Sequence, residues 1–313
     1  MRSGVEESVH HGDVAVCDST GHLIAWAGDP ERRAFGRSSL KPVQAAVSLE
    51  AIGEDLPDAE LAVMCGSHTG EPVHVEAAAR VLERAGLDFG ALRLPSEWPF
   101  DRETVVPEPR PEYHNCSGKH AGMVLASARR GWDLETYPQP DHPLQTRIRR
   151  AVLKLAGSGD AQVGVDGCGL PVYALSLTQL ATMFARVVRP MEASPLYREL
   201  TRVYQAMLAE PYLVGGRGRV ATAVMQACRS VVVKGGAEGL MCAGALDPGL
   251  GIAVKVRDGA ARASGPALIR VLHLLDLIGT PDVNRIRAHA EPPVLGGGRP
   301  VGSLIADFPL KGR

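Results

Sequence analysis

Three short apolar runs in the last third of the chain determine the architecture that this sequence predicts: Ser230-Val231-Val232-Val233-Lys234, Gly239-Leu240-Met241-Cys242-Ala243 and Gly251-Ile252-Ala253-Val254-Lys255-Val256. Their length and composition favour β-strands. Near the N-terminus, two alternating runs within residues 14–26 flank the turn Asp18-Ser19-Thr20-Gly21 and predict a hairpin. Strands at both ends of the chain, with helices between them, imply one sheet that the two termini build together.

The segment between these strand groups has mainly helical signals. From Ser39 to Ile52, apolar residues recur at helical spacing, and Pro42 is tolerated because it falls in the first turn. Further helices are predicted within 56–87 (two pieces around a turn at 66–70) and at 118–130, 142–155, 176–188 and 194–209. Residues 90–112 are predicted to be irregular, and the Gly/Pro-rich tail after Pro281 to be a weakly ordered end.

Composition limits the fold class and the partners. The 313 residues are 45% hydrophobic and predict a single α+β domain with a sheet lobe (about 1–55 and 225–280) and a mainly helical lobe (about 56–224). With 34 Lys+Arg against 35 Asp+Glu, neither nucleic acid nor a membrane surface is an expected partner. A polar N-terminus without a secretory signal and six dispersed cysteines predict a cytoplasmic protein with reduced thiols.

One short motif has the residues for nucleophilic chemistry: Arg37-Ser38-Ser39-Leu40-Lys41-Pro42. The spacing of three places Ser38 and Lys41 on one face of the predicted helix. A serine hydroxyl needs a base within hydrogen-bond reach, and a lysine can serve if burial keeps its amine neutral. The same spacing is also common where a serine caps a helix and the lysine is solvated, so the motif alone leaves both interpretations open.

Two further residues suit the same chemistry. Ser67 lies in the small-residue turn Cys65-Gly66-Ser67-His68-Thr69-Gly70, from which a hydroxyl could project. Lys234 ends an apolar strand and is followed by two glycines, which allow the backbone to approach a ligand closely. Taken alone, Lys234 fits an exposed lysine before a hairpin turn equally well.

A second group of polar residues consists of His114-Asn115-Cys116-Ser117-Gly118-Lys119-His120 and Asp166-Gly167-Cys168-Gly169-Leu170-Pro171. Two cysteines in such surroundings could bind a borderline metal such as zinc. The chain has no Cys-x-x-Cys pair and no His-Glu-x-x-His helix, so spacing by itself gives the metal weak support.

These segments, taken in order, resemble the L-asparaginase II family, the class 3 type first associated with Rhizobium, from Arg2 to about Ala263. The resemblance rests on the motif around Ser38, on Ser67-His68-Thr69-Gly70-Glu71-Pro72, on residues 115–123 and 166–171, and on Lys234-Gly235-Gly236-Ala237-Glu238-Gly239. It implies a fold similar to serine β-lactamases, penicillin-binding proteins and serine-dependent glutaminases, with an antiparallel sheet formed by both termini and an all-helical lobe.

The resemblance also implies roles for individual residues. Ser38 would be the nucleophile and Lys41 its base, while Ser67 and Lys234 would form a second pair that relays protons and holds the substrate; Ser67 as the nucleophile is the alternative. Zinc would be bound by three ligands, with no organic cofactor: Cys116, Lys119 and Cys168. A lysine ligand must be deprotonated, so spacing would not have suggested it.

The implied reaction is hydrolysis of L-asparagine to L-aspartate and ammonia, a step of asparagine catabolism, in a homodimeric enzyme. Backbone N–H groups near Ser38 and Gly236 are candidates for stabilising the oxyanion. Candidates for the charged groups of the substrate are Arg37, His68 and Asp166, and the substrate-binding set is completed by two residues of the same blocks, Asn115 and Glu238.

Two alternatives stay open on the sequence. One is a glutaminase, or another serine acyl hydrolase or transferase of the β-lactamase-like fold. The other is a non-catalytic module in which the cysteines bind zinc for structure.

Overall fold

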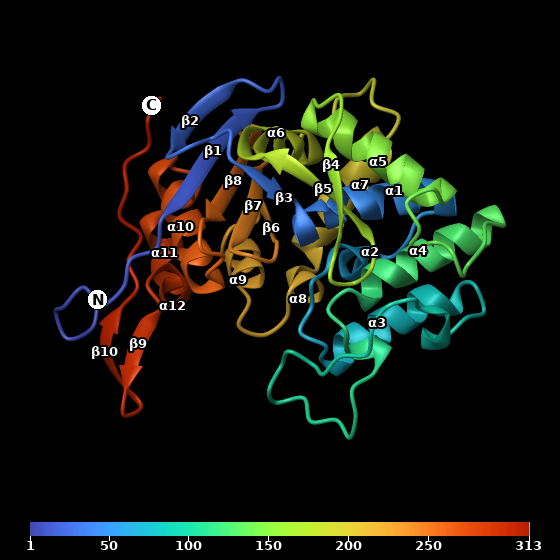
Figure 1. The fold of residues 1–313 in the computed structure, drawn as a ribbon, viewed down its shortest axis with the longest axis horizontal. Coiled ribbons are helices and arrows are strands. Elements are labelled where there is room, and N and C mark those ends of the chain that lie inside the picture. The colour runs from blue at the N-terminus through green and yellow to red at the C-terminus, as the bar shows by residue number, and fades with distance from the viewer. Residues whose placement is uncertain (313) are drawn as a thin grey trace.

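The sheet predicted from both chain ends is present in the computed structural model, which describes residues 1–312. It has five strands in the order β2-β1-β8-β7-β6, and every neighbouring pair is antiparallel. The strands are β1 (Gly12–Asp18), β2 (Leu23–Ala27), β6 (Val231–Gly235), β7 (Leu240–Ala245) and β8 (Leu250–Val256). The N-terminal strand β1 pairs with β8 along its whole length, with Ala15 opposite Ala253, so the expected closure by the two termini is confirmed (Figure 1).

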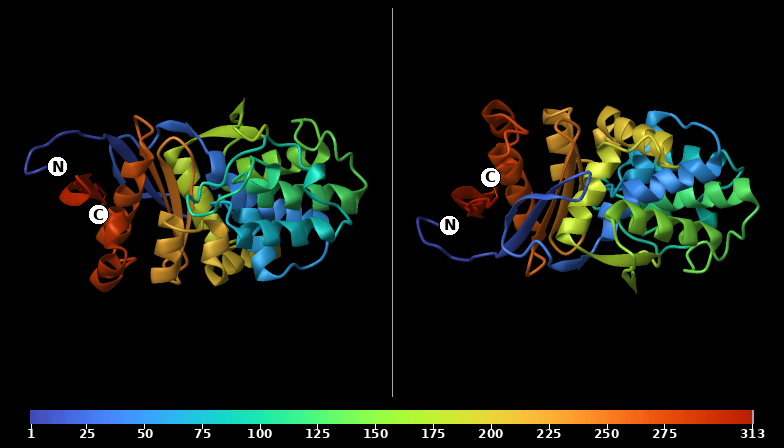
Figure 2. Two further views of the ribbon diagram at one scale, coloured as in Figure 1. Left: turned by 90° about the horizontal axis from the view of Figure 1, so that it is seen from below. Right: turned by 90° about the horizontal axis from the view of Figure 1, so that it is seen from above.

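The chain between the two strand groups forms the helical lobe, which Figure 2 shows beside the sheet. Its helices are η1 (Arg37–Leu40), α1 (Lys41–Ile52), α2 (Asp58–Cys65), α3 (Pro72–Glu83), η2 (Phe89–Ala91), η3 (Pro111–Tyr113), α4 (Ser117–Arg130), α5 (Pro143–Ala156), α6 (Leu177–Val188), α7 (Tyr197–Ala209), α8 (Pro211–Val214) and α9 (Val220–Ala227). Ser176 and Gln179 form a capping box that starts α6. Within residues 1–312, no helix combines the length and apolar composition needed to span a bilayer.

The sheet is covered on both faces. Helix α6 packs on β1, β7 and β8 from the side of the helical lobe, and α10 (Ala261–Leu274) covers the outer face of β7 and β8 (Figure 2). The contact with α6 is close, because a Cβ added at Gly251 of β8 would lie 1.8 Å from the carbonyl oxygen of Ala181. Only a residue without a side chain allows the helix to approach the strand this closely.

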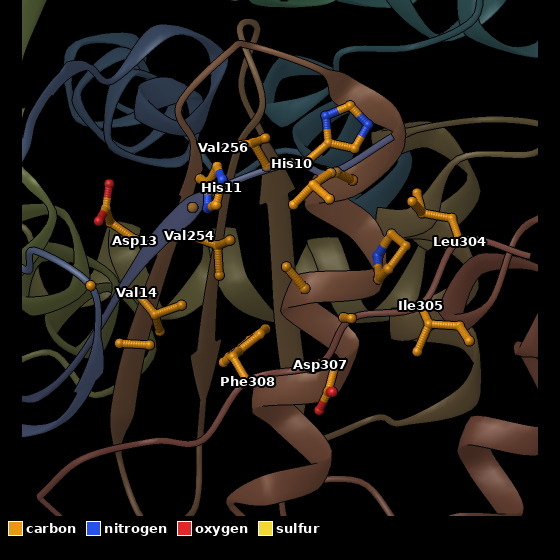
Figure 3. Close-up of a pocket in the computed structure, with 18 of the residues that line it drawn as sticks. His10, His11, Asp13, Val14, Val254, Val256, Leu304, Ile305, Asp307 and Phe308 are labelled. Atoms are coloured by element: carbon orange, nitrogen blue, oxygen red, sulfur yellow. The ribbon is translucent and has the colours of Figure 1, made fainter. Parts of the chain in front are cut away.

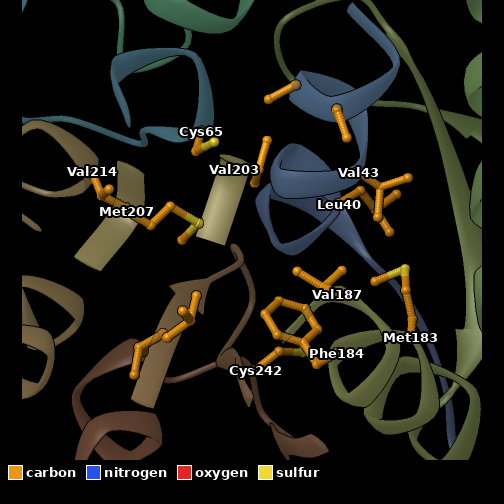
Figure 4. Close-up of a cluster of buried hydrophobic side chains, with 14 of the residues drawn as sticks. Leu40, Val43, Cys65, Met183, Phe184, Val187, Val203, Met207, Val214 and Cys242 are labelled. Atoms are coloured by element: carbon orange, nitrogen blue, oxygen red, sulfur yellow. The ribbon is translucent and has the colours of Figure 1, made fainter. Parts of the chain in front are cut away.

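One hydrophobic core joins the two lobes and includes residues at the start of α1, next to the predicted motif of residues 37–42 (Figure 4). Leu40 of η1 and Val43 of α1 are fully buried, as are Phe184 of α6 and Cys242 of β7. Burial of each large apolar side chain stabilises the fold by roughly 1.5–3 kcal/mol. The start of α1 is therefore fixed against both lobes, and with it the side chains that it carries.

A second sheet was not predicted. It has the order β3-β5-β4 and is formed by β3 (Arg33–Phe35), β5 (Pro171–Ser176) and β4 (Gln162–Val165). Strand β5 is buried at every position, so it lacks the alternation that marks a strand in sequence. The loop between β4 and β5 carries Asp166 and Cys168, and the sheet thereby positions the second polar block.

The prediction of a weakly ordered tail is wrong. Residues after Gly279 form α11 (Thr280–Arg285), α12 (Arg287–Ala290), β9 (Pro293–Gly296) and β10 (Arg299–Ser303). Gly297 and Gly298 have φ values of 55° and 76° and make the tight turn of the β9–β10 hairpin, for which glycine is preferred. Beyond it, Lys311 N–H donates to the carbonyl oxygen of Trp26 in β2 at 2.8 Å.

Candidate functional site

A serine hydroxyl lies between two buried lysine amines where α1, the segment after α2, and β6 meet. Ser67 Oγ is 2.9 Å from Lys41 Nζ and 2.7 Å from Lys234 Nζ. Lys41 is the first residue of α1, and Lys234 is the fourth residue of β6. We call these three side chains the serine–lysine cluster.

Both amines in this cluster are shielded from water and have no carboxylate partner within residues 1–312. Lys41 Nζ also contacts the carbonyl oxygen of Gly66 and donates to that of Asn115 at 3.1 Å, while Lys234 Nζ donates to the carbonyl oxygen of Gly235 at 3.0 Å. Burial lowers the pKa of Lys41, and burial together with the nearby positive charges lowers the pKa of Lys234 further. The site therefore disfavours a proton on each amine at the same time.

Ser38 lies next to this cluster in sequence, but its side chain makes no hydrogen bond to any of residues 1–312. It is partly exposed on η1, whereas Lys41 is fully buried and directed at Ser67. The first hydrogen bond of η1 runs from Ser39 N–H to the carbonyl oxygen of Gly36. The N–H of Ser38 lies one residue earlier and has no backbone partner in the described chain. The predicted pair of Ser38 and Lys41 is thus not hydrogen-bonded in this structure.

Arg37 and Asp166 lie together, although 129 residues separate them. Arg37 has a φ of 46°, a left-handed conformation that is uncommon for a residue with a side chain. Its Nε donates to Asp166 Oδ1 at 2.6 Å, and Gly167 N–H donates to the same oxygen at 2.9 Å. Burial acts to raise the pKa of Asp166, but Lys119 and Arg37 outweigh it and hold that pKa below its usual value. Each of the two predicted substrate-binding residues largely neutralises the other.

The three predicted zinc ligands also converge. Lys119, in the first turn of α4, donates from Nζ to Cys168 Sγ at 3.0 Å, and Cys116 lies within hydrogen-bond reach of Cys168. The hydrogen bond from Cys116 and the charge of Lys119 outweigh burial and lower the pKa of Cys168 to about 5. Burial acts to lower the pKa of Lys119, but the surrounding anionic groups raise it.

This donor set fits zinc, because the lowered pKa of Cys168 favours its thiolate and the other two side chains supply the sulfur and nitrogen that zinc prefers. Three protein ligands would leave a fourth position open. Within residues 1–312, no three side chains of His, Cys, Asp or Glu gather as in a conventional metal site. The predicted set differs from such a site because one ligand is a lysine.

Three predicted substrate contacts, those of His68, Gly236 and Glu238, are unfavourable in this structure. His68 is fully buried; its Nδ1 accepts from Gly70 N–H at 3.2 Å and its Nε2 donates to Ser117 Oγ at 3.1 Å, so no ring nitrogen is free. Gly236 N–H donates to Leu240 at 2.8 Å inside the β6–β7 hairpin and is unavailable to an oxyanion.

Glu238 is exposed in the turn of the same hairpin. A Cβ added at Gly259 would lie 2.7 Å from Glu238 Oε2, so this carboxylate faces the loop after β8. Asn115 contributes differently from the prediction: its backbone oxygen binds Lys41, while its side-chain Oδ1 lies 3.0 Å from Cys116 Sγ.

The sequence did not indicate the backbone acceptors around Lys41. The carbonyl oxygens of Gly66 and Asn115 belong to two different segments, and nothing in residue type marks a carbonyl as a partner. It also did not indicate Arg219, which lies near Lys234 and contributes to lowering the pKa of that amine.

A cavity occurs on the other face of the sheet, between β1, β8, α10 and the C-terminal segment (Figure 3). Val14, Val254, Val256 and Phe308 line its apolar part, and His10 lies at its edge. None of the predicted site residues lines this cavity, so it is separate from the serine–lysine cluster.

Fold and site together define an α+β protein with a buried serine–lysine cluster and an adjacent site of two cysteines and a lysine. The model of the L-asparaginase II family matches residues 1–306, and the chain belongs to this family. Membership identifies an asparaginase-type amidohydrolase that acts on a small molecule.

Solved structures that are similar to this chain include the following two. One is a β-lactamase from Mycobacterium bovis, with 16% sequence identity and a TM-score of 0.42 over 79% of this chain and 87% of that one. The other is Mglu in its native form, with 16% identity and a TM-score of 0.46 over 89% of this chain and 65% of that one. No curated protein sequence matches the chain at a significant level.

Proposed function

We propose that the protein hydrolyses the side-chain amide of L-asparagine to L-aspartate and ammonia through an acyl-enzyme on Ser38. The observation that carries this proposal is the position of Ser67 Oγ, 2.9 Å from one buried amine and 2.7 Å from the other. Both contacts belong to Ser67, which can pass the proton of Lys41 on to Lys234. The uncharged Lys41 amine is then the base that a serine nucleophile needs, and Ser38 precedes Lys41 by three residues. Family membership supports the amide as the bond that is cleaved.

The two amines of the cluster share one proton through Ser67. A protonated Lys41 has three N–H donors and three acceptors, namely the carbonyls of Gly66 and Asn115 and the hydroxyl of Ser67. Ser67 can in turn donate its own proton to a neutral Lys234. When Ser67 accepts a proton from Lys41 as it passes its own to Lys234, Lys41 becomes neutral without any charge entering from solvent.

Ser38 is the better nucleophile of the two serines. Its hydroxyl is partly exposed and has no partner within residues 1–312, whereas the hydroxyl of Ser67 is buried and held by both amines. Lys41 follows Ser38 at the spacing that places both on one helical face. We propose that the hydrogen bond between them forms when substrate binds, since catalytic hydrogen bonds are often long or poorly aligned in a free enzyme.

The reaction has two stages, acylation of Ser38 and hydrolysis of the resulting ester. Ser38 Oγ bonds to the amide carbon while its proton moves to Lys41 Nζ, and the oxyanion that forms accepts from the free Ser38 N–H. The C–N bond breaks as Lys41 returns the proton to the departing nitrogen, which leaves ammonia and an ester on Ser38. Water attacks the ester, gives one proton to Lys41, and releases aspartate as Ser38 Oγ takes that proton back.

We also propose that Cys116, Lys119 and Cys168 hold one zinc ion. The metal would supply positive charge that can polarise a carbonyl or stabilise a developing negative charge. Lys119 carries a raised pKa without metal, so binding must release its proton, and affinity should rise with pH. Metal analysis of purified protein tests this: about one zinc per chain is expected, with loss in Cys168→Ser. Equal zinc in both proteins would refute the site.

Substitution of the nucleophile tests the mechanism. Ser38→Ala should reduce ammonia release from L-asparagine by about 10³-fold or more, because it removes the proposed nucleophile, the partly exposed serine hydroxyl that precedes Lys41 by three residues. Ser39→Ala is the matched control, since its hydroxyl donates to the carbonyl oxygen of Gly36 and not into the cluster. Mass spectrometry of protein quenched during turnover should locate an aspartyl ester on Ser38.

An ester on Ser67, or unchanged ammonia release in Ser38→Ala, would refute the assignment. Substrate range is checked with L-asparagine, L-glutamine and a chromogenic β-lactam. Comparable turnover of all three would refute asparagine as the preferred substrate and favour a less specific serine acyl hydrolase.

Assembly and location are part of the same proposal. By resemblance to the family, we propose a homodimer in the cytoplasm, with the whole chain forming one catalytic unit. Light scattering on the purified protein would give the mass of two chains; the mass of one chain would contradict the dimer.

A further inference from the structure

A guanidinium without an acidic partner stands beside the serine–lysine cluster. Arg219 is the N-cap residue of α9, and its side chain makes no hydrogen bond or ion pair with any of residues 1–312. It is exposed to solvent, yet the protein surrounds it closely enough that desolvation lowers its pKa. A charge in such surroundings interacts with an incoming anion more strongly than a charge on an open surface.

Backbone contacts bring the loop that carries this arginine to the cluster, and its charge acts on Lys234. Ser67 N–H donates to the carbonyl oxygen of Val214 at 2.9 Å, and the chain runs from Val214 through a short loop to Arg219. A Cβ added at Gly215 would lie 3.1 Å from Cβ of Arg219, so the arginine folds back over the start of that loop. Helix α9 then packs on β6, the strand that carries Lys234.

The other cations around the cluster already have partners. Arg37 is paired with Asp166, and Lys119 with Cys168. Lys41 and Lys234 are occupied by Ser67. Arg217, two residues before Arg219, is exposed and forms ion pairs with three carboxylates: Glu71, Asp101 and Glu103. Within the described chain, Arg219 is the cation at this site that is left to meet a negative charge from a ligand.

We propose that the Arg219 guanidinium binds the α-carboxylate of the substrate and selects for amides that carry one. The inference rests on the proposed amidase function and adds a specificity residue to it. L-Asparagine has one anionic group, its α-carboxylate, which matches the planar fork of a guanidinium in a bidentate pair. Arg37 does not fill this role because Asp166 already occupies its Nε.

A pair of substrates that differ only in the carboxylate tests the proposal. 3-Aminopropanamide has the amide and the amine of L-asparagine but lacks the α-carboxylate. We expect Arg219→Ala to lower kcat/KM for L-asparagine by about 10- to 100-fold, mainly through KM, because a charge-assisted bidentate pair is lost. The same variant should leave kcat/KM for 3-aminopropanamide nearly unchanged. Arg219→Lys should recover part of the loss, since it keeps the charge but not the fork.

Arg217→Ala is the matched control, because it removes an arginine from the same loop that is already paired with carboxylates. It should keep the preference of the wild type for L-asparagine over 3-aminopropanamide. A parallel loss on both substrates in Arg219→Ala would show that the residue supports the loop and would overturn the proposal.

A binding measurement separates this inference from the proposed catalytic function. By calorimetry, the wild type should bind L-aspartate more tightly than β-alanine, which is aspartate without its α-carboxylate, and Arg219→Ala should abolish that difference. Absence of ammonia release from both amides in the wild type would refute the proposed function alone. Equal affinity of the wild type for L-aspartate and β-alanine would refute the role of Arg219.

Discussion

The strongest physical claim about the site is that the folded protein keeps the amine of Lys234 uncharged at a pH where the unfolded chain protonates it. Lys234→Met removes this amine while keeping a side chain of similar length. A group whose pKa differs between folded and unfolded protein makes the free energy of unfolding depend on pH. Wild type and Lys234→Met should therefore differ in this pH dependence, whatever their activity.

The sign and size of this pH dependence follow from the burial of Lys234. In the unfolded chain a lysine has a pKa of about 10.4, and in the folded protein burial lowers the pKa of Lys234 well below its usual value. Between those two pKa values the unfolded state binds one more proton, so the free energy of unfolding rises by about 1.4 kcal/mol per pH unit. Methionine has no proton to lose. The stability of the wild type relative to the variant should therefore increase by that slope as pH rises towards about 10.

Urea unfolding at pH 7, 8 and 9 measures this difference, with ionic strength held constant. Lys154→Met, which removes an exposed lysine of α5, provides the baseline. Titrating groups distant from the cluster are shared by wild type and variant and cancel in the difference. Lys41 is the exception, because its charge acts on Lys234. A difference that does not change with pH would show that Lys234 stays protonated in the folded protein, and the proton relay through Ser67 would then be wrong.

Two further predictions concern the frame of the site. Gly251→Ala should destabilise the protein by about 3 kcal/mol or more, because its Cβ would lie 1.8 Å from the carbonyl oxygen of Ala181 and α6 would have to move. Thermal unfolding measures this loss of stability. Gly159→Ala is the control, because no atom lies within 4 Å of a Cβ added there. Asp13→Asn should cost about 2–4 kcal/mol at pH 7, since Asp13 is fully buried and binds Arg257 through both carboxylate oxygens. Burial acts to raise the pKa of Asp13, but its hydrogen bonds lower it overall, so its contribution is present above about pH 4 and lost as pH falls through the lower folded value. Denaturation at pH 7 and pH 3 should show the gap between wild type and variant shrinking in acid, and a gap independent of pH would contradict the assignment.

Local patterns predicted much of the fold. The hairpin of β1 and β2, the late strands β6, β7 and β8, and helices such as α4 and α6 occur close to the ranges that the sequence predicted. The failures have local causes as well. Strand β5 is buried on both faces and shows no alternation, and the glycines at 297–298 form a hairpin turn where composition suggested disorder.

The site was predicted in part. Ser67, Lys41 and Lys234 were singled out and lie together, as do Cys116, Lys119 and Cys168. The substrate-binding residues chosen by charge stay predictions, because charge in a sequence says nothing about which partner a side chain finds in the fold. His68 and Arg37 are already satisfied by protein groups, and Arg219, which has no partner within residues 1–312, carried no recognisable motif.

The sequence by itself determined which residues can do chemistry and which segments are strands or helices, because spacing of three or four along a helix and of two along a strand is set by backbone geometry. It did not determine the partners of those residues. Lys41 has Ser38 three positions away, yet it bonds to Ser67, 26 residues on, and Lys234 reaches the same hydroxyl across 167 residues. Only the packing of α1, α2 and β6 into one core brings these groups within 3 Å and removes the water that would otherwise keep both amines charged.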